Sequence, residues 1–130
     1  MLKQTFIGVK GGNKMSRILV LDDNKGICSL IEEIFTMDGH EVRSYSDISL
    51  FDREIEKFRP DIGLFDLHMA KDMLKIIKKV KSIYPNMKGI IMSADEPQEP
   101  FTEFPFISKP FDIIALRNLV YENLKQEIIV

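Results

Sequence analysis

The stretch RILVLDD at residues 17–23 decides the fold class of this chain. It is a short, continuous apolar run that stops at two carboxylates, and such a run is typical of a strand buried on both faces of a parallel sheet. Residues 61–66, which read DIGLFD, repeat the pattern, and residues 88–93, which read KGIIMS, form a third apolar run. These runs predict the buried strands of an α/β domain.

Amphipathic helical patterns separate these strands. Each pattern carries apolar residues at helical spacing, and a capping residue, a glycine or a proline marks every boundary except the start of the third pattern, which is set by its first apolar residue. The boundaries are Asn24 and Gly39, Asp47 and Pro60, Met73 and Pro85, and Asp112 at the start of the last helix.

Two further strands complete the predicted sheet. Polar and apolar residues alternate over residues 41–45, which predicts a more exposed strand, and residues 104–108 predict a short one. Strands and helices alternate along the chain, which predicts a doubly wound, five-stranded parallel sheet with helices on both faces. Ligands of such sheets bind outside the carboxyl ends of the strands.

Length and composition favour one soluble domain. The 130 residues are 45% apolar and 29% charged, with a net charge of −2, which indicates neither disorder nor binding to nucleic acid or membranes. A single cysteine, Cys28, cannot form an internal disulfide, so a cytoplasmic protein is expected. We expect residues 1–15 to be a flexible N-terminal extension and residues 16–130 to be the domain.

Polar residues follow the predicted strands at the edge where a ligand is expected. They are Asp22 and Asp23, Asp66, Ser93, and Lys109 followed by Pro110. Carboxylates crowded at one rim repel one another, and a divalent cation that prefers hard oxygen ligands, Mg²⁺, relieves that repulsion. A lysine and a hydroxyl at the same rim suit the oxygens of a phosphoryl group. Each residue alone is a common turn former, but their joint occurrence favours a site.

In four ordered segments the chain resembles the receiver domains of bacterial two-component response regulators. The segments are ILVLDDN at 18–24, LFDLHM at 64–69, IIMSA at 90–94 and FISKPF at 106–111. The resemblance implies a flavodoxin-like sheet with the strand order 2-1-3-4-5. It also implies a phosphorylation-dependent signalling switch that needs Mg²⁺.

The resemblance assigns a role to each residue of the rim. Asp66 would accept the phosphoryl group, and Asp22, Asp23, Asp66 and the backbone carbonyl of His68 would hold the metal ion, Asp22 through water. Ser93 and Lys109 would contact the attached phosphoryl group. Phe106 would turn inward with Ser93 as an aromatic switch, and the Lys109–Pro110 peptide bond would be cis.

The chain departs from the family pattern in two places. Ala70 and Leu74 stand where the family usually has proline and glycine, and Lys109 follows Ser93 after an unusually short interval. Prolines in residues 94–105 disfavour a helix there, so the family's fourth helix is expected to be shortened or absent. This loop is hypothesised to be the mobile element. Because the family dimerises through the affected face, a monomer or weak dimer is expected.

Three functions are compatible with these residues. The favoured one is a stand-alone receiver that takes a phosphoryl group from a sensor histidine kinase or phosphotransfer protein and acts in trans on an effector. It is not expected to be an enzyme beyond assisting its own phosphorylation and dephosphorylation. The alternatives are a pseudo-receiver that binds partners constitutively, and a phosphohydrolase of the haloacid-dehalogenase kind. The hydrolase needs a carboxylate two residues after Asp66, where this chain has His68.

Two smaller signals concern partners. The third helical segment is rich in lysine, which favours a solvated face over a patch for nucleic acid or an acidic partner, because no aromatic residues are interleaved. The apolar end at residues 128–130 is expected either to dock on the body or to help bind a partner.

Overall fold

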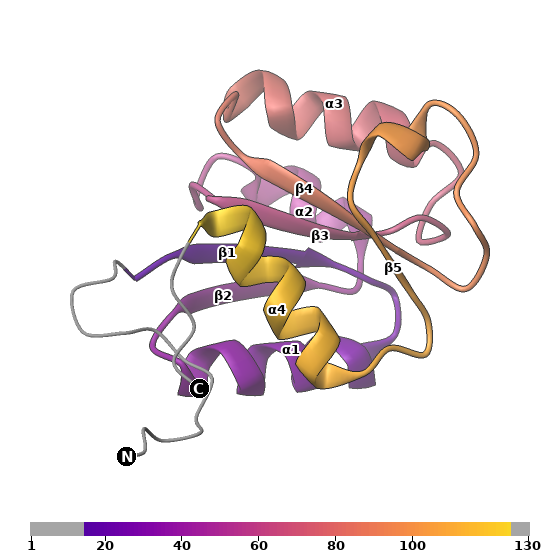
Figure 1. Cartoon of the computed structure of the whole chain (residues 1–130). Coiled ribbons are helices and arrows are strands. Elements are labelled where there is room, and N and C mark those ends of the chain that lie inside the picture. Colours follow the sequence, from indigo (N-terminus) through magenta and orange to yellow (C-terminus); the bar gives the residue numbers. More distant parts are fainter. Residues whose placement is uncertain (1–14, 126–130) are drawn as a thin grey trace, which may run out of the picture.

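The computed structural model describes residues 15–125, and it confirms the predicted doubly wound sheet. All neighbouring strands pair in parallel, in the order β2-β1-β3-β4-β5 (Figure 1). The strands are β1 (Arg17–Leu21), β2 (Glu41–Tyr45), β3 (Ile62–Asp66), β4 (Lys88–Ser93) and β5 (Phe106–Ser108). The predicted extension, apart from Met15, and the apolar end at residues 128–130 lie outside the described residues.

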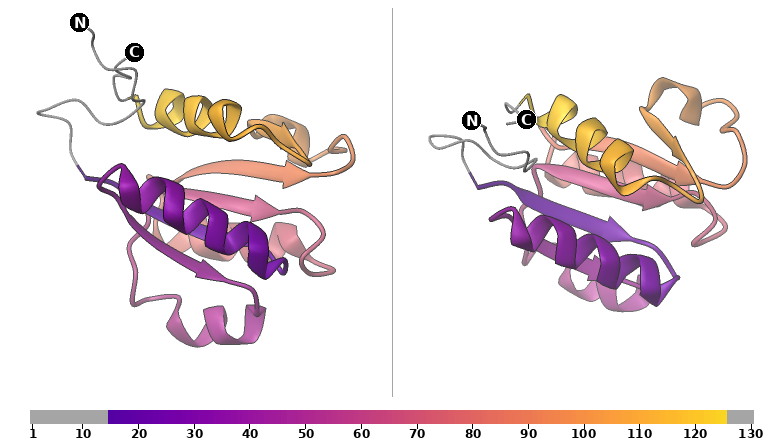
Figure 2. Two further views of the ribbon diagram at one scale, coloured as in Figure 1. Left: turned by 90° about the horizontal axis from the view of Figure 1, so that it is seen from below. Right: turned by 60° about the horizontal axis from the view of Figure 1, so that its bottom comes forward.

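The helices cover both faces of the sheet. They are α1 (Lys25–Met37), α2 (Ile48–Glu54), α3 (Met73–Ile83) and α4 (Ile113–Leu124). In the right-hand view of Figure 2, α1 and α4 lie in front of the sheet and α2 and α3 lie behind it. Two apolar cores result, one between the sheet and the α1/α4 pair and the other between the sheet and the α2/α3 pair. In residues 15–125 no helix is long and apolar enough to cross a membrane.

Most of the predicted helix boundaries are confirmed. The side chains of Asn24, Asp47 and Asp112 each accept a hydrogen bond from a backbone N–H of the first turn, as N-caps do. Gly39, just after α1, has a φ of 93°, which a residue without a Cβ adopts at no steric cost. The second helix ends at Glu54, however, well before the predicted boundary at Pro60, and the chain continues through one turn and irregular backbone.

The connection between β4 and β5 contains no α-helix. Its only helical element is the single 3₁₀ turn η1 (Phe101–Glu103), which confirms that the family's fourth helix is absent. The backbone N–H of Phe104 donates to the carbonyl of Phe101 and closes this turn, so β5 begins only at Phe106 and not at Phe104 as predicted. The hypothesis that residues 94–105 are mobile stays a prediction.

A buried polar network ties α4 to the end of α1. The backbone N–H of Ser16 donates to Nδ1 of His40 (3.0 Å), so Nε2 carries the proton and donates to the Tyr121 hydroxyl at 3.1 Å. That hydroxyl donates to Asp38 Oδ2 at 2.5 Å, and the Arg117 guanidinium holds both oxygens of the same carboxylate. The network holds α4 against the sheet at the end away from the strands' carboxyl edge.

Acidification is expected to weaken the fold through His40. Burial lowers the pKa of this imidazole, against the opposing pull of Asp38 and Asp61. Below about pH 6.5 the unfolded chain therefore binds more protons than the folded one, so the stability that His40 contributes is complete above that pH and is lost as the pH falls through its folded pKa. Urea denaturation at pH 7 and pH 5 should show a smaller difference for His40→Gln than for the native chain. Equal differences for the two chains, or an NMR titration of His40 above pH 6.5, would contradict this.

Candidate functional site

The predicted polar residues meet at the carboxyl edge of the sheet. Asp22 directly follows β1, Asp66 ends β3, Ser93 ends β4, and Lys109 directly follows β5. The strand order changes direction between β1 and β3, and a parallel sheet has its binding crevice at such a switch point. Asp22, Asp66 and Ser93 are buried there, whereas Asp23 is exposed to solvent.

Three carboxylates form a cluster that fits a divalent cation. One oxygen each from Asp22, Asp23 and Asp66 lie within 4.8 Å of one another. These are hard oxygen donors, and two of them are buried where nearby water cannot disperse their charge. The donor set therefore suits a hard cation and would hold it with one face open to solvent through Asp23. The fourth predicted ligand, the carbonyl of His68, stays a prediction, although the N–H of His68 does donate to Asp66 Oδ1 at 3.1 Å.

Lys109 supplies the positive charge of the site. Its Nζ lies 2.6 Å from Asp22 Oδ2 and 3.6 Å from Asp66 Oδ1. The ammonium is largely buried and contacts both carboxylates, so it partly neutralises the cluster. The backbone N–H of Lys109 donates to the carbonyl of Ser93, and the Lys109–Pro110 peptide bond is cis, as the resemblance implied.

The environment of Asp66 sets its charge state and reactivity. Burial is the main cause that raises the pKa of this carboxyl, and the charges of Asp22 and Asp23 raise it further. The hydrogen bond from the His68 N–H and the charge of Lys109 oppose the shift. A carboxylate that has few water molecules around it and a lysine beside it can act as a nucleophile toward an electrophile that carries negatively charged oxygens.

Ser93 and Phe106 lie on the two strands at the β4/β5 side. Ser93 is fully buried, and its Oγ accepts a hydrogen bond from the backbone N–H of Asp95 at 3.1 Å. Phe106 is half-buried, pairs in register with Ile91 of β4, and packs against the core on the α2/α3 side. The structure thus places both residues near the rim, but it gives no contact between them.

Three supporting contacts were not predicted from the sequence. The backbone N–H of Asn24 donates to Asp22 Oδ1 at 2.9 Å, and the thiol of Cys28 donates to the carbonyl of Asp22 at 3.1 Å. An aspartate two residues before an asparagine cap could have indicated the first contact, because Asp side chains often bond the backbone two residues on. At the surface, His68 Nε2 lies 3.6 Å from Asp95 Oδ2, beside the mouth of the site.

A doubly wound sheet with this carboxylate cluster, buried hydroxyl and lysine defines the receiver class of two-component signalling domains. The family model described as "Response regulator receiver domain" matches residues 18–121. The chain belongs to this family.

Similar proteins agree with the family match. Sporulation initiation phosphotransferase F of Bacillus subtilis is 31% identical over 116 residues, which cover 83% of this chain and 93% of that protein. The DNA-binding transcriptional regulator NtrC of Azospirillum brasilense is 29% identical over 114 residues, which cover 82% of this chain but only 24% of that protein.

Solved structures share the fold. A CheY-like response regulator receiver domain protein from Methanospirillum hungatei superposes with a TM-score of 0.76 at 23% identity, over 86% of this chain and 95% of that one. The response regulator TrrA of Thermotoga maritima, solved in complex with Mg²⁺-BeF, has a TM-score of 0.70 at 20% identity, over 83% of this chain and 98% of that one.

Proposed function

We propose that this chain is a phosphorylation-dependent signalling switch of the cytoplasm. Asp66 accepts a phosphoryl group from a sensor histidine kinase or a phosphotransfer protein, with Mg²⁺ as cofactor, and the modified chain acts in trans on an effector protein. The observation that supports this most is the position of Asp66, buried between two carboxylates and within 3.6 Å of the Lys109 ammonium. The similarity to a sporulation phosphotransferase supports a role in phosphoryl relay.

The residues of the rim divide the chemistry among them. A carboxylate oxygen of Asp66 attacks the phosphorus of the donor, a new P–O bond forms, and the P–N bond to the donor histidine breaks. The released imidazole takes up a proton from water. Asp22, Asp23 and Asp66 would hold Mg²⁺, which neutralises negative charge on the phosphoryl oxygens when bound. Lys109 supplies a second positive charge to the same oxygens and orients them.

Phosphorylation then changes which hydrogen bonds the rim can make. The hydroxyl of Ser93 accepts from the Asp95 N–H and has its own proton to donate to a phosphoryl oxygen on Asp66. Such a contact exists in only one state, so it shifts the population of conformations, and Phe106 on the adjacent strand follows Ser93. The chain assists its own phosphorylation and dephosphorylation and turns over no separate substrate.

The two alternative functions have less support. A constitutive pseudo-receiver does not need a buried acceptor, a paired lysine and a hydroxyl at the same rim, all of which this chain has. A haloacid-dehalogenase-type hydrolase needs a carboxylate where His68 stands, and the nearest acidic neighbour of that imidazole is the exposed Asp95.

Removal of the metal ion is expected to slow the reaction strongly. With a small acyl phosphate and Mg²⁺, intact mass measurement should show the native chain gaining one phosphoryl group. With a chelator in place of Mg²⁺ the rate should fall about a hundredfold, because a Lewis acid contributes several kcal/mol to a transition state of this charge. Equal rates in the two buffers, or no gain of mass with Mg²⁺, would contradict the proposed function.

A further inference from the structure

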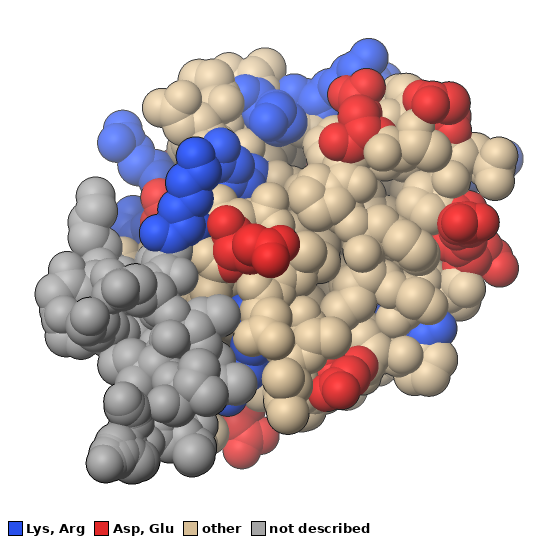
Figure 3. All heavy atoms as spheres, viewed as in Figure 1, with Lys and Arg blue, Asp and Glu red and all other residues tan. Residues whose placement is uncertain are grey.

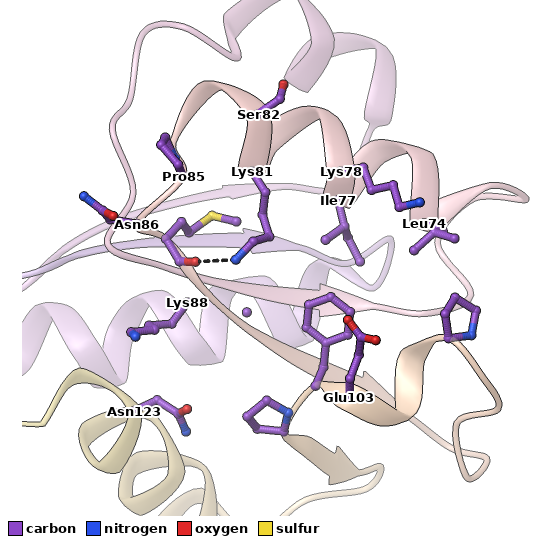
Figure 4. A pocket seen from close by; sticks show the side chains of 15 residues that line it. Leu74, Ile77, Lys78, Lys81, Ser82, Pro85, Asn86, Lys88, Glu103 and Asn123 are labelled. Atoms are coloured by element: carbon purple, nitrogen blue, oxygen red, sulfur yellow. Dashed lines mark hydrogen bonds between the residues drawn. The ribbon is translucent and has the colours of Figure 1, made fainter.

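A groove lies where the connection from β4 to β5 lacks its helix. It has a volume of about 1000 Å³ and runs between α3, the first residues of β4 and the η1 segment, with Asn123 of α4 at one side (Figure 4). Its apolar lining comes from both sides, with Leu74 and Ile77 on α3, Met87 before β4, and Pro100, Phe104 and Pro105 from the connection. The groove lies outside the carboxylate cluster and shares no residue with it.

Phe104 and Gly89 form the floor of this groove. The ring of Phe104 lies over Gly89 of β4, and a Cβ built on that glycine would approach the ring to 3.3 Å. The aromatic ring therefore covers the edge of the sheet in place of a helix. It is thinner than a helix, so the space above it, between η1 and α3, stays open to solvent.

The two rims of the groove carry opposite charge. Lys78 and Lys81 of α3 line one side and Glu103 of η1 lines the other, while Lys88 of β4 lies at the end of the groove beside Asn123 (Figure 4). Lys81 is held at the rim because its Nζ donates to the carbonyl of Met87 at 3.0 Å. Lys78 and Lys88 are exposed and have no ion-pair partner among residues 15–125.

The charges are also separated on the surface as a whole. Figure 3 shows Lys and Arg side chains gathered over α3 and the start of β4, and acidic side chains along the connection to β5. Other lysines of this region are accounted for, since Lys79 pairs with Asp52 at 3.3 Å and Lys75 is solvated away from the groove. A positive rim beside an apolar floor is therefore a local feature of the groove, within the solvated face predicted for α3.

We propose that the groove binds an amphipathic helix of a partner protein, with an apolar stripe against the partly exposed Leu74 and Phe104 and carboxylates facing the lysine rim of α3. An apolar trough with one charged rim matches the helix-in-groove mode, in which spaced apolar anchors give affinity and flanking charges fix orientation. Glu103 would repel the carboxylates of the bound helix if they lay on its own side of the groove. The helix therefore binds in only one of its two chain directions. The groove binds this helix without phosphorylation, so the proposal is independent of the function of Asp66.

Peptides of defined charge test the groove. The probe is a designed helical peptide with leucines at i, i+3, i+4 and i+7 and glutamates along one flank, compared with the same peptide carrying lysines at those flanking positions. When the glutamate peptide is added to the ¹⁵N-labelled, unphosphorylated chain, the amide NMR resonances around Leu74, Gly89 and Phe104 should shift. The glutamate peptide should bind about tenfold more tightly than the lysine peptide. Shifts elsewhere, equal affinities, or no binding up to about 1 mM would overturn the proposal.

Matched variants connect affinity to the rims. The double variant Lys78→Glu/Lys88→Glu should bind the glutamate peptide about tenfold more weakly, and Glu103→Lys should bind it more tightly. Lys75→Glu makes the same kind of charge change on α3 outside the groove and should leave binding unchanged. Equal losses in Lys75→Glu and the double variant would overturn the proposal. So would groove amides that shift when residues 126–130 are deleted or when the chain is diluted, because the occupant would then be the chain itself.

Discussion

The Asp66→Asn variant is expected to gain no phosphoryl group from a small acyl phosphate in the presence of Mg²⁺, whereas the native chain gains one. Asparagine has nearly the same shape, but its neutral amide oxygen is a poor nucleophile. The neighbouring carboxylates do not replace it. Asp22 is held by Lys109 and by the N–H of Asn24, and Asp23 lies on the exposed side of the cluster. Intact mass measurement checks the result.

A folded control makes the loss in this variant interpretable. Because Asp66 is buried beside two other carboxylates, its neutralisation removes repulsion, and the free energy of unfolding at pH 7 is expected to rise by about 1 kcal/mol. Asp52→Asn, which changes an exposed aspartate on α2, should be phosphorylated like the native chain. Phosphoryl uptake by Asp66→Asn, or an equal loss in Asp52→Asn, would contradict the assignment.

The Lys109→Met variant is expected to lose about 3 kcal/mol of stability in buffer without divalent cations. Asp22 is completely buried and its Oδ2 lies 2.6 Å from Nζ of Lys109, so removal of the ammonium leaves a buried charge without its partner. The remaining carboxylates of Asp23 and Asp66 add repulsion. Mg²⁺ should restore part of the loss, because a ligand that binds only the folded state stabilises it. Urea denaturation with and without Mg²⁺ measures both effects.

An exposed ion pair provides the comparison. Lys79 Nζ lies 3.3 Å from Asp52 Oδ1, with both side chains about half exposed, so Lys79→Met should change the free energy of unfolding by no more than about 0.5 kcal/mol. If Lys79→Met and Lys109→Met were equally destabilised, the buried Lys109–Asp22 pair would contribute no more to the free energy of unfolding than an exposed pair does. If Mg²⁺ stabilised Lys109→Met no more than the native chain, the ammonium would not substitute for a metal ion.

Local signals in the sequence predicted the elements and the position of the site. Each apolar run ends at a polar residue, so the chain order alone indicates which side chains reach the carboxyl edge of a parallel sheet. Caps such as Asn24 and Asp112 are equally local, because the side chain bonds the backbone two or three residues on. Asp72, which caps α3, was missed, since the predicted boundary there rested on apolar spacing that begins at Met73.

Features that depend on distant residues could not be predicted in this way. His40 meets Tyr121 across 81 positions, and neither residue has a neighbour that indicates the other. Lys109 was expected near the phosphoryl group, but its closer approach to Asp22 than to Asp66 follows only from the packing of β5 beside β4. Likewise, the prolines of residues 94–105 predicted the missing helix, but not the ring of Phe104 over Gly89 or the groove above it.

Identification of the modified atom tests the central claim most directly. Borohydride reduces an aspartyl phosphate to homoserine, so the native chain is treated with an acyl phosphate and Mg²⁺, reduced, digested and sequenced by mass spectrometry. Our account predicts homoserine at position 66 and unmodified aspartate at positions 22 and 23. A chain that gains a phosphoryl group while Asp66 remains aspartate, with the group found on His68 or Ser93, would contradict it.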